Sequence, residues 1–377
     1  MTSLAFHVDR LPPRSGGAGP YVRRLVPALV REDPSLEVRL FHARRRARGP
    51  LDPLVREHWT VELAQAARTL FPRWNLLGRP RLPRSLSSLD LLHAPSPRTV
   101  PPAGAGQTLV VSVSDLAFLV VPFAFPSAWR STLRTGLRAA VKRADAIITP
   151  SRATAEDLLT RTKVDPARVH VVPLAPALDV EENGPDPDEV VSRLKLPVPY
   201  ILSAGWLDPR RNVVRLIRAY RRAAATGIPH ALVLAGPLGW RHQTLLREIA
   251  LPGPGDVVLT GPLSNEDLDA VYRRASAFAY PALYEGAGFP VLEAMARGIP
   301  VVCSNTSSLP EVVGGDAALV NPLSVREIAS AIETVIGDTG LREQLAERSR
   351  ARAERFSWRE TARRTLEVYE QARGSKD

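Results

Sequence analysis

Residues 284–298 read YEGAGFPVLEAMARG, and no other stretch indicates more about the fold and chemistry of this chain. The pattern predicts a loop that carries Glu285, followed by a short helix that opens at Pro290, since Pro is favoured at the first helical position. Glu293 falls in the first turn of this helix, and Gly298 marks its end. The two Glu side chains are therefore expected on either side of a helix start.

The start of such a helix favours an anion, because its first backbone amides have no partner within the helix. Gly286 and Gly288 would allow a ligand to come close to the backbone. Carboxylates repel an anion, so Glu285 and Glu293 are better suited to accept hydrogen bonds from hydroxyl groups on either side of it. A ligand that has hydroxyls, a phosphate group and further hydroxyls is a nucleotide sugar.

The length and composition predict a soluble α/β protein of two domains. The chain has 377 residues, 45% of them apolar and 6% aromatic, and one hydrophobic core rarely serves so many. No apolar run approaches the ~20 residues of a membrane span. The start, Met1–Val8, is expected to be a strand rather than a signal peptide. A single cysteine, Cys303, excludes a disulfide framework and suits a reducing cytoplasm.

The formal net charge is +11, and Arg residues are concentrated at 44–48 and between 68 and 84. One interpretation is an Arg-biased but simply solvated surface. Another is peripheral contact with an anionic membrane at its inner face, where each basic residue adds about 1 kcal/mol. Nucleic-acid binding is disfavoured, because aromatic residues do not interleave with the basic ones and no known binding module is present.

Short apolar runs alternate with amphipathic segments, which predicts parallel sheets covered by helices. The expected strands are 4–8, 37–41, 90–93, 108–113, 146–149, 169–173, 200–204, 231–235, 257–259, 277–280 and 300–303. The expected helices are 20–31, 128–143, 153–161, 213–225, 265–275 and most of 325–373.

The acidic, Pro-rich stretch 179–188 is the best candidate for a linker. The predicted fold is accordingly α/β, with two similar Rossmann-like, doubly wound domains that face each other across a cleft. The predicted boundaries are an N-terminal domain at 1–178, a linker at 179–195, a C-terminal domain at 196–356, and a closing helix at 357–377.

A first glycine loop, Ser15–Tyr21, lies between the first strand and the first helix. Its spacing does not fit a dinucleotide fingerprint, which would need Gly where Val22 stands. Gly16 and Gly17 could still hold a diphosphate or let a sugar approach the backbone. A tight strand-to-helix turn explains the same residues without a ligand.

A second loop, Ser203–Asn212, places Arg210 and Arg211 directly before a helix. Cations at the start of a helix are unfavourable, because they oppose the helix dipole. A bound anion between the two Arg side chains would explain their position, since Arg binds phosphate bidentately. Two solvated surface charges are the alternative.

Two further polar residues, His93 and Asp115, follow predicted strands, where side chains can reach a ligand site; a purely structural role is equally compatible. The histidines are scattered, so a metal site has no support. No Gly-x-Ser-x-Gly motif is present, so a serine nucleophile elbow is also missing.

The chain resembles the retaining family-4 glycosyltransferases of the GT-B fold, and is mannosyltransferase-like. The likeness is strongest from Leu263 to Gly314, which includes the opening stretch. Residues 209–212 are similar to the family's Pro-Arg-Lys-Asn, residues 16–19 to its first glycine loop, and the segment from Phe356 to Tyr369 to its closing helix.

The resemblance implies roles for individual residues. Glu285 would contact hydroxyls of the donor sugar, Glu293 the nucleotide ribose, and Arg210 and Arg211 the diphosphate leaving group, which makes a metal or other cofactor unnecessary. The predicted catalytic residues are Glu285, Arg210, Arg211 and Asp115. The predicted donor-binding residues are Gly16, Gly17, Gly205, Gly236, Leu263, Gly286, Gly288, Phe289 and Glu293. The acceptor would lie beside His93 and Ser114.

Three residues depart from the family pattern. Arg211 replaces a Lys, which keeps the charge but changes the geometry. Ala287 stands where a Phe is frequent. Ser114 stands where many members carry a His that contacts the transferred sugar, and a Ser is a poor general base at neutral pH.

Two functions follow from these residues. The first is an enzyme that transfers a sugar, from GDP-mannose or a UDP-sugar, to the hydroxyl of a glycan, lipid-linked or small-molecule acceptor, with retention and without a metal. The second is a catalytically silent subunit that binds a sugar nucleotide and regulates or scaffolds a partner transferase, for which Ser114 and Ala287 argue.

Overall fold

The computed structural model describes residues 2–8, 18–44, 58–180 and 184–375. Gly16, Gly17, the Arg-rich stretch 45–48 and part of the predicted linker lie outside them. The described chain divides into two compact units. The first comprises residues 1–119, 126–174 and 357–377, and the second comprises 120–125 and 175–356.

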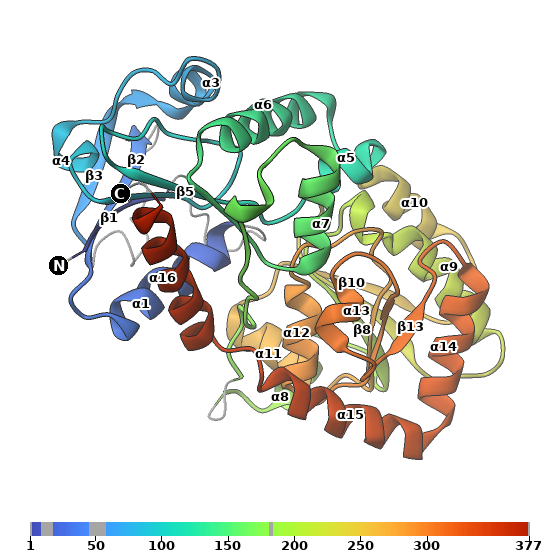
Figure 1. The fold of residues 1–377 in the computed structure, drawn as a ribbon. Helices are drawn as coiled ribbons and strands as arrows, with labels where there is room; N and C mark the ends of the chain where they lie inside the picture. The colour runs from blue at the N-terminus through green and yellow to red at the C-terminus, as the bar shows by residue number, and fades with distance from the viewer. Residues whose placement is uncertain (1, 9–17, 45–57, 181–183, 376–377) are drawn as a thin grey trace. The chain divides into compact units, whose positions relative to one another are not determined.

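The first unit contains a seven-stranded parallel sheet in the order β3-β2-β1-β4-β5-β6-β7 (Figure 1). Its strands are β1 (Ser3–His7), β2 (Glu37–Arg44), β3 (Thr60–Ala66), β4 (Leu91–Ala94), β5 (Thr108–Ser112), β6 (Ala146–Thr149) and β7 (Val169–Val171). Its helices are α1 (Ala18–Glu32), α3 (Ala67–Leu77), α4 (Arg84–Ser87), α5 (Ala117–Val120), α6 (Ser127–Arg143), α7 (Arg152–Arg161) and the C-terminal α16 (Trp358–Gly374). A 3-10 turn, η2 (Pro166–Arg168), precedes β7.

Helix α16 returns to the first unit, although it is the last element of the chain (Figure 1). It packs against α1 and against strands β5 and β6. Ser357 caps its start by accepting a hydrogen bond from the amide of Glu360. The hydroxyl of Thr361 donates to the carbonyl of Pro173, 2.8 Å away, and thereby fastens the helix beside the end of the sheet.

The second unit contains a six-stranded parallel sheet in the order β10-β9-β8-β11-β12-β13. Its strands are β8 (Tyr200–Ala204), β9 (Ala231–Ala235), β10 (Val257–Gly261), β11 (Ala277–Tyr280), β12 (Val301–Ser304) and β13 (Ala318–Val320). Its helices are α8 (Pro187–Arg193), α9 (Val213–Ala224), α10 (Gln243–Ala250), α11 (Asn265–Arg273), α12 (Phe289–Ala296), α13 (Leu309–Val313), α14 (Val325–Gly337) and α15 (Thr339–Ala353). Two 3-10 turns, η1 (Pro122–Ala124) and η3 (Pro209–Arg211), also belong to it.

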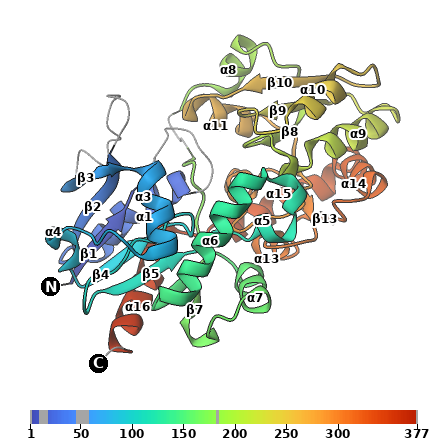
Figure 2. The ribbon, with the colours of Figure 1, turned by 90° about the horizontal axis from the view of Figure 1, so that it is seen from above.

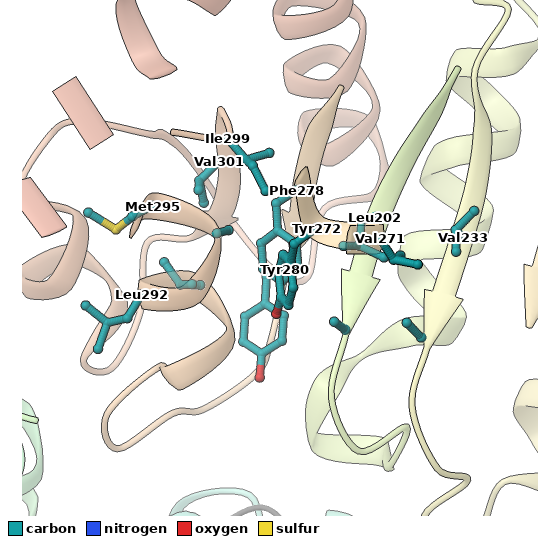
Figure 3. Packing of buried hydrophobic residues seen from close by; sticks show 14 of the residues in the cluster. Leu202, Val233, Val271, Tyr272, Phe278, Tyr280, Leu292, Met295, Ile299 and Val301 are labelled. Carbon is teal, nitrogen blue, oxygen red and sulfur yellow. The ribbon is translucent and has the colours of Figure 1, made fainter. Parts of the chain in front are cut away.

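Successive residues of the strands in this unit face opposite layers, as a parallel sheet with helices on both sides requires. Leu202, Phe278 and Val301 pack with α8, α11 and α12, whereas their neighbours Ile201 and Val302 pack with α9 and α14. Figure 3 shows the first layer, in which Tyr272, Phe278 and Tyr280 lie between α12 and strands β8 and β9. Helices α9 and α14, both labelled in Figure 2, pack against each other.

The α/β class and the two Rossmann-like domains predicted from the sequence are confirmed, since both sheets are parallel and interleaved with helices. In each unit the strand order reverses beside the first strand, between β1 and β4 and between β8 and β11. In open α/β sheets, ligands bind outside the carboxyl ends of the strands at such a switch point.

The division of the chain differs from the predicted boundaries in two places. The second unit begins at Ala175 rather than after a linker that starts at 179. It also includes the short segment Val120–Phe125, which falls within the predicted N-terminal domain. The ring of Phe125 lies 5.4 Å from that of Trp240, between centroids, and the Trp240 indole donates to the carbonyl of Ala124. These contacts explain why this segment belongs with the second unit.

Candidate functional site

The opening stretch forms a loop and helix α12 at the carboxyl end of β11, directly at the switch point of the second sheet. Helix α12 begins at Phe289, one residue before the Pro that was predicted to open it. Gly288 caps the helix with φ of 68°, a left-handed conformation that favours glycine. A Cβ at this position would lie 2.9 Å from Cδ2 of Leu309.

The loop after β8 supplies the two predicted arginines. Asp208 accepts a hydrogen bond from the amide of Arg210 and so begins the turn η3. Asn212 ends it in a left-handed conformation, and its side-chain amide donates to the carbonyls of Pro281 and Pro322. The amide of Leu283 donates to the carbonyl of Arg210. These bonds tie together the loops that follow β8 and β11.

The structure brings three predicted catalytic residues together. Glu285 accepts a hydrogen bond from Arg211, and its Oε1 lies 3.5 Å from Nη1 of Arg210. The Tyr280 hydroxyl donates to the same Oε1 over 3.2 Å, and the guanidinium of Arg211 lies 5.0 Å from the Tyr280 ring centroid. All three charged side chains are largely buried. Two cations therefore surround one carboxylate, which leaves a local excess of positive charge.

A second loop supports Glu285 from the opposite side. The amide of Glu285 donates to Oγ of Ser307, and the amide of Ser308 lies 3.4 Å from the Glu285 carbonyl. Ser307 has φ of 55°, which is rare for a residue other than glycine. Neither Ser307 nor the contact of Tyr280 with Glu285 could be predicted, because no local pattern of residues marks them.

Three glycines lie where the first strands of this sheet end. Gly205 follows β8, Gly236 follows β9, and Gly261 closes β10, all with positive φ. A Cβ on Gly236 would lie 2.1 Å from the carbonyl oxygen of Gly205, so only glycine fits where these two loops cross. Close packing against Gly205 therefore explains why position 236 is glycine, and the donor contacts predicted for both residues stay predictions.

The remaining predicted donor residues surround the start of α12 and the loop after β10. Gly286 is buried and Phe289 is partly exposed. Leu263 is partly buried against the core layer of α11 and α12. Their contacts with a donor stay predictions. Gly16 and Gly17 lie outside the described residues.

Glu293 lies on α12 with only 8% of its surface exposed. Its Oε2 accepts a hydrogen bond from the hydroxyl of Tyr272, 3.1 Å away. Burial raises the pKa of this carboxyl to about 7, although the positive charges of Arg297 and Arg211 and the hydroxyl of Tyr272 act in the opposite direction. A buried carboxylate that titrates near neutrality is typical of a functional site.

The predicted acceptor-side residues belong to the first unit. His93 is fully buried; its Nδ1 lies 2.6 Å from the hydroxyl of Tyr369 and its Nε2 lies 2.7 Å from Oγ of Ser112. Burial lowers the pKa of His93 to about 3, so the ring is neutral. Both nitrogens have partners within the protein, and this geometry favours a structural role that joins α16 to the sheet over the predicted acceptor contact.

Ser114 and Asp115 follow β5 and are half-buried. Asp115 Oδ1 accepts a hydrogen bond from the amide of Ala117 and thereby starts helix α5. The catalytic role of Asp115 and the acceptor-side position of Ser114 stay predictions.

Among the described residues, no three His, Cys, Asp or Glu side chains are grouped as metal ligands. Within the same part of the chain, no helix combines the length and apolar character needed to cross a bilayer.

Comparisons with known proteins agree with this geometry. The family model of the Glycosyl transferases group 1 matches residues 187–352, and that of Glycosyltransferase Family 4 matches residues 15–178. O-antigen chain mannosyltransferase B of Escherichia coli is 37% identical over 172 residues, 45% of each chain. MMP alpha-(1->4)-mannosyltransferase of Mycolicibacterium hassiacum is 34% identical over 232 residues, 60% of this chain and 54% of that protein. The matches therefore span about half the length of these curated relatives.

Solved structures share the fold. The structure of Anabaena HepE in complex with UDP and glucose aligns with a TM-score of 0.72 at 18% identity, over 98% of this chain and 100% of that one. The two family models follow each other along the chain, and both units have the parallel sheets of this fold. The chain therefore belongs to the glycosyltransferases of the GT-B fold, with a family-4 region followed by a group-1 region.

Proposed function

We propose that this protein transfers a sugar from a nucleotide-sugar donor to a hydroxyl of an acceptor, with retention of the anomeric configuration. The observation that carries the proposal is the convergence of Arg210, Arg211 and Glu285 at the switch point of the second sheet. The group-1 region of the chain contains all three.

The paired arginines suit a diphosphate leaving group. Their guanidinium groups neutralise charge that develops when the glycosidic bond breaks, which is the task a metal ion performs in other enzymes. Transfer would therefore be independent of a metal. The diphosphate would take the place of Glu285 beside the arginines, and the released carboxylate would accept hydrogen bonds from hydroxyls of the sugar.

The donor is proposed to be GDP-mannose, with a UDP-sugar as the alternative. Several relatives are named as mannosyltransferases, which supports mannose. The HepE structure, which was solved with UDP and glucose, supports the alternative. Glu293 would bind the ribose of either nucleotide.

Purified protein incubated with GDP-mannose, UDP-glucose and related donors tests this function. Hydrolysis or transfer from one donor, lost in Glu285→Ala but kept in Glu266→Ala, is the expected result; Glu266 is an exposed glutamate on α11 of the same unit. Nucleotide binding without turnover on any acceptor would favour the silent subunit. If no nucleotide or nucleotide sugar raises the melting temperature, both functions are wrong.

We also propose that the first unit contacts an anionic membrane at its inner, cytoplasmic face. Helices α3 and α6 pack together, and Leu76, Leu77 and Trp129 are exposed on them. Residues 67–89 and 116–144 contain no acidic residue but ten basic ones, among them the exposed Arg73, Arg79, Arg81, Arg84, Arg134, Arg138 and Lys142. Apolar side chains among these cations suit anionic headgroups.

Flotation with liposomes tests this contact. Binding to vesicles that contain phosphatidylserine should weaken with rising salt, because exposed charges are screened, and should weaken further in Arg134→Glu/Arg138→Glu. Equal binding to neutral vesicles, or none to anionic ones, would show that this surface is merely solvated.

A further inference from the structure

A second group of polar residues lies next to Glu293, and no local pattern in the sequence marks it. Arg297 stands one helical turn after Glu293, and its side chain is fully buried. Its Nη1 donates to the carbonyl of Glu293 over 2.8 Å, and the guanidinium lies 5.1 Å from the ring centroid of Tyr272. Tyr272 in turn donates its hydroxyl to the Glu293 carboxylate.

Arg297 is neutralised by a carboxylate that is equally buried. Oδ1 of Asp269 lies 2.8 Å from Nε and 2.6 Å from Nη2 of Arg297. The other oxygen of Asp269 accepts a hydrogen bond from Nε of Arg273, at 2.7 Å. Asp269, Tyr272 and Arg273 all lie on α11, so the pair joins this helix to α12.

The same group holds the chain where it enters the second unit. Nη2 of Arg297 donates to the carbonyl of Asp179 over 2.6 Å. The backbone amide of Leu178 forms a hydrogen bond with the Glu293 carboxylate. The Glu293 carboxylate thus accepts hydrogen bonds from Tyr272 and the Leu178 amide, and its backbone carbonyl accepts one from Arg297.

A buried ion pair gains little stability compared with apolar residues of the same size, because both charges lose their hydration. The presence of the Arg297–Asp269 pair is therefore better explained by its effect on the neighbouring Tyr272 and Glu293, which Arg297 contacts. Without it, the Glu293 carbonyl and the Tyr272 ring would lose their contacts with the guanidinium, and the carboxylate of Glu293 would be held less firmly in one direction. A carboxylate that binds two vicinal hydroxyls must be held in one orientation, whereas a solvated carboxylate has no such requirement.

We propose that Tyr272 and the Arg297–Asp269 pair are positioning residues that orient Glu293 toward the ribose hydroxyls of the donor nucleotide. This inference rests on the proposed function, because it assumes that a nucleotide binds at α12.

The protonation state of Glu293 gives the inference a second readout. The groups that face its carboxylate are Tyr272 from α11, Arg297 directly after α12, Arg211 from η3 and the Leu178 amide, with Asp269 behind Arg297. Burial raises the pKa of Glu293 to about 7, while the Tyr272 hydroxyl lowers it. Removal of that hydroxyl should raise the pKa further, and the ionised form that accepts both ribose hydroxyls would then appear only at higher pH.

Titration calorimetry with four nucleotides tests the proposal: GDP, UDP and their 2′,3′-dideoxy forms. The wild-type protein should bind one ribonucleotide more tightly than its dideoxy form, and Glu293→Gln should abolish most of this preference. Tyr272→Phe, which keeps the ring, should reduce the preference about five- to tenfold and shift the pH midpoint of binding upward. Arg297→Lys should reduce the preference less than Arg297→Met.

Tyr220→Phe is the matched control. Tyr220 is fully buried in the same unit, but its hydroxyl donates to the His230 carbonyl on the far side of the sheet. It should leave both the preference and the pH midpoint unchanged. If Tyr272→Phe behaves as Tyr220→Phe does while Glu293→Gln loses the preference, the positioning role is wrong and the proposed function stands. If the wild-type protein binds none of the four nucleotides, the proposed function itself fails.

Discussion

Replacement of Glu293 by Gln should stabilise the protein at alkaline pH, although it removes a proposed ligand contact. The carboxyl is buried, and burial raises its pKa from 4.5 to about 7. Between these two values the folded chain keeps a proton that the unfolded chain has released. Stability conferred by this proton is present below about pH 4.5 and is lost as the pH rises through about 7.

The magnitude follows from the gap between the two pKa values. At about 1.4 kcal/mol for each pH unit, the gap corresponds to about 3 kcal/mol of lost stability above pH 8. Gln has the same shape, has no charge to desolvate, and can still accept the hydroxyl of Tyr272. The free energy of unfolding of Glu293→Gln should therefore exceed that of the wild-type protein by up to about 3 kcal/mol at pH 8.5 and by little at pH 5.

Urea unfolding at pH 5 and pH 8.5, followed by tryptophan fluorescence, measures this difference. Glu248→Gln is a control of opposite sign in the same unit. Arg218 lowers the pKa of the Glu248 carboxyl by hydrogen bonding, over distances of 3.0 and 2.7 Å. This variant should lose stability at pH 8.5. A Glu293→Gln variant whose stability relative to wild type is the same at both pH values would refute the reasoning, because the carboxylate would then carry no desolvation cost.

Three further predictions concern structural supports of the two units. Gly236→Ala should destabilise the second unit by about 3 kcal/mol or more, because φ is 135° and the new Cβ would meet the Gly205 carbonyl; unchanged urea unfolding would contradict this. Asn212→Ala should lower the free energy of unfolding by about 2–3 kcal/mol, because it removes two hydrogen bonds to backbone carbonyls at a residue with φ of 61°. Calorimetry should show this loss, and a smaller loss for Asn212→Gly. Tyr369→Phe should lower the free energy of unfolding by about 1 kcal/mol, because His93 loses a hydrogen-bond partner. A change in nucleotide affinity in this variant would argue against a structural role for His93.

The strands that the sequence predicted best are the buried ones. Tyr200–Ala204, Ala231–Ala235 and Ala277–Tyr280 were predicted with the observed bounds, because strands buried on both faces form continuous apolar runs. The edge strands Thr60–Ala66 and Ala318–Val320 were missed. Both strands are only partly buried, and Ala318–Val320 is only three residues long, so neither forms the continuous apolar run of a central strand.

The donor side of the site was also visible in the sequence. Each of its main features is local: an Arg pair before a helix, and a Gly loop between Glu285 and Glu293. The structure added that both loops leave neighbouring strands, β8 and β11, and so meet at one edge of the sheet.

The sequence by itself determined the α/β class, the two sheets and the residue types of the donor site, because these depend on periodicity and short spacing. Only the tertiary structure decided which polar residues find partners inside the protein. His93 lies within hydrogen-bond distance of Tyr369, which is 276 positions away in the chain. Glu293 accepts hydrogen bonds from Tyr272 on α11 and, at its carbonyl, from Arg297 at the end of α12. Such roles depend on burial and on partners that are distant in the sequence, and a local pattern of residues contains neither.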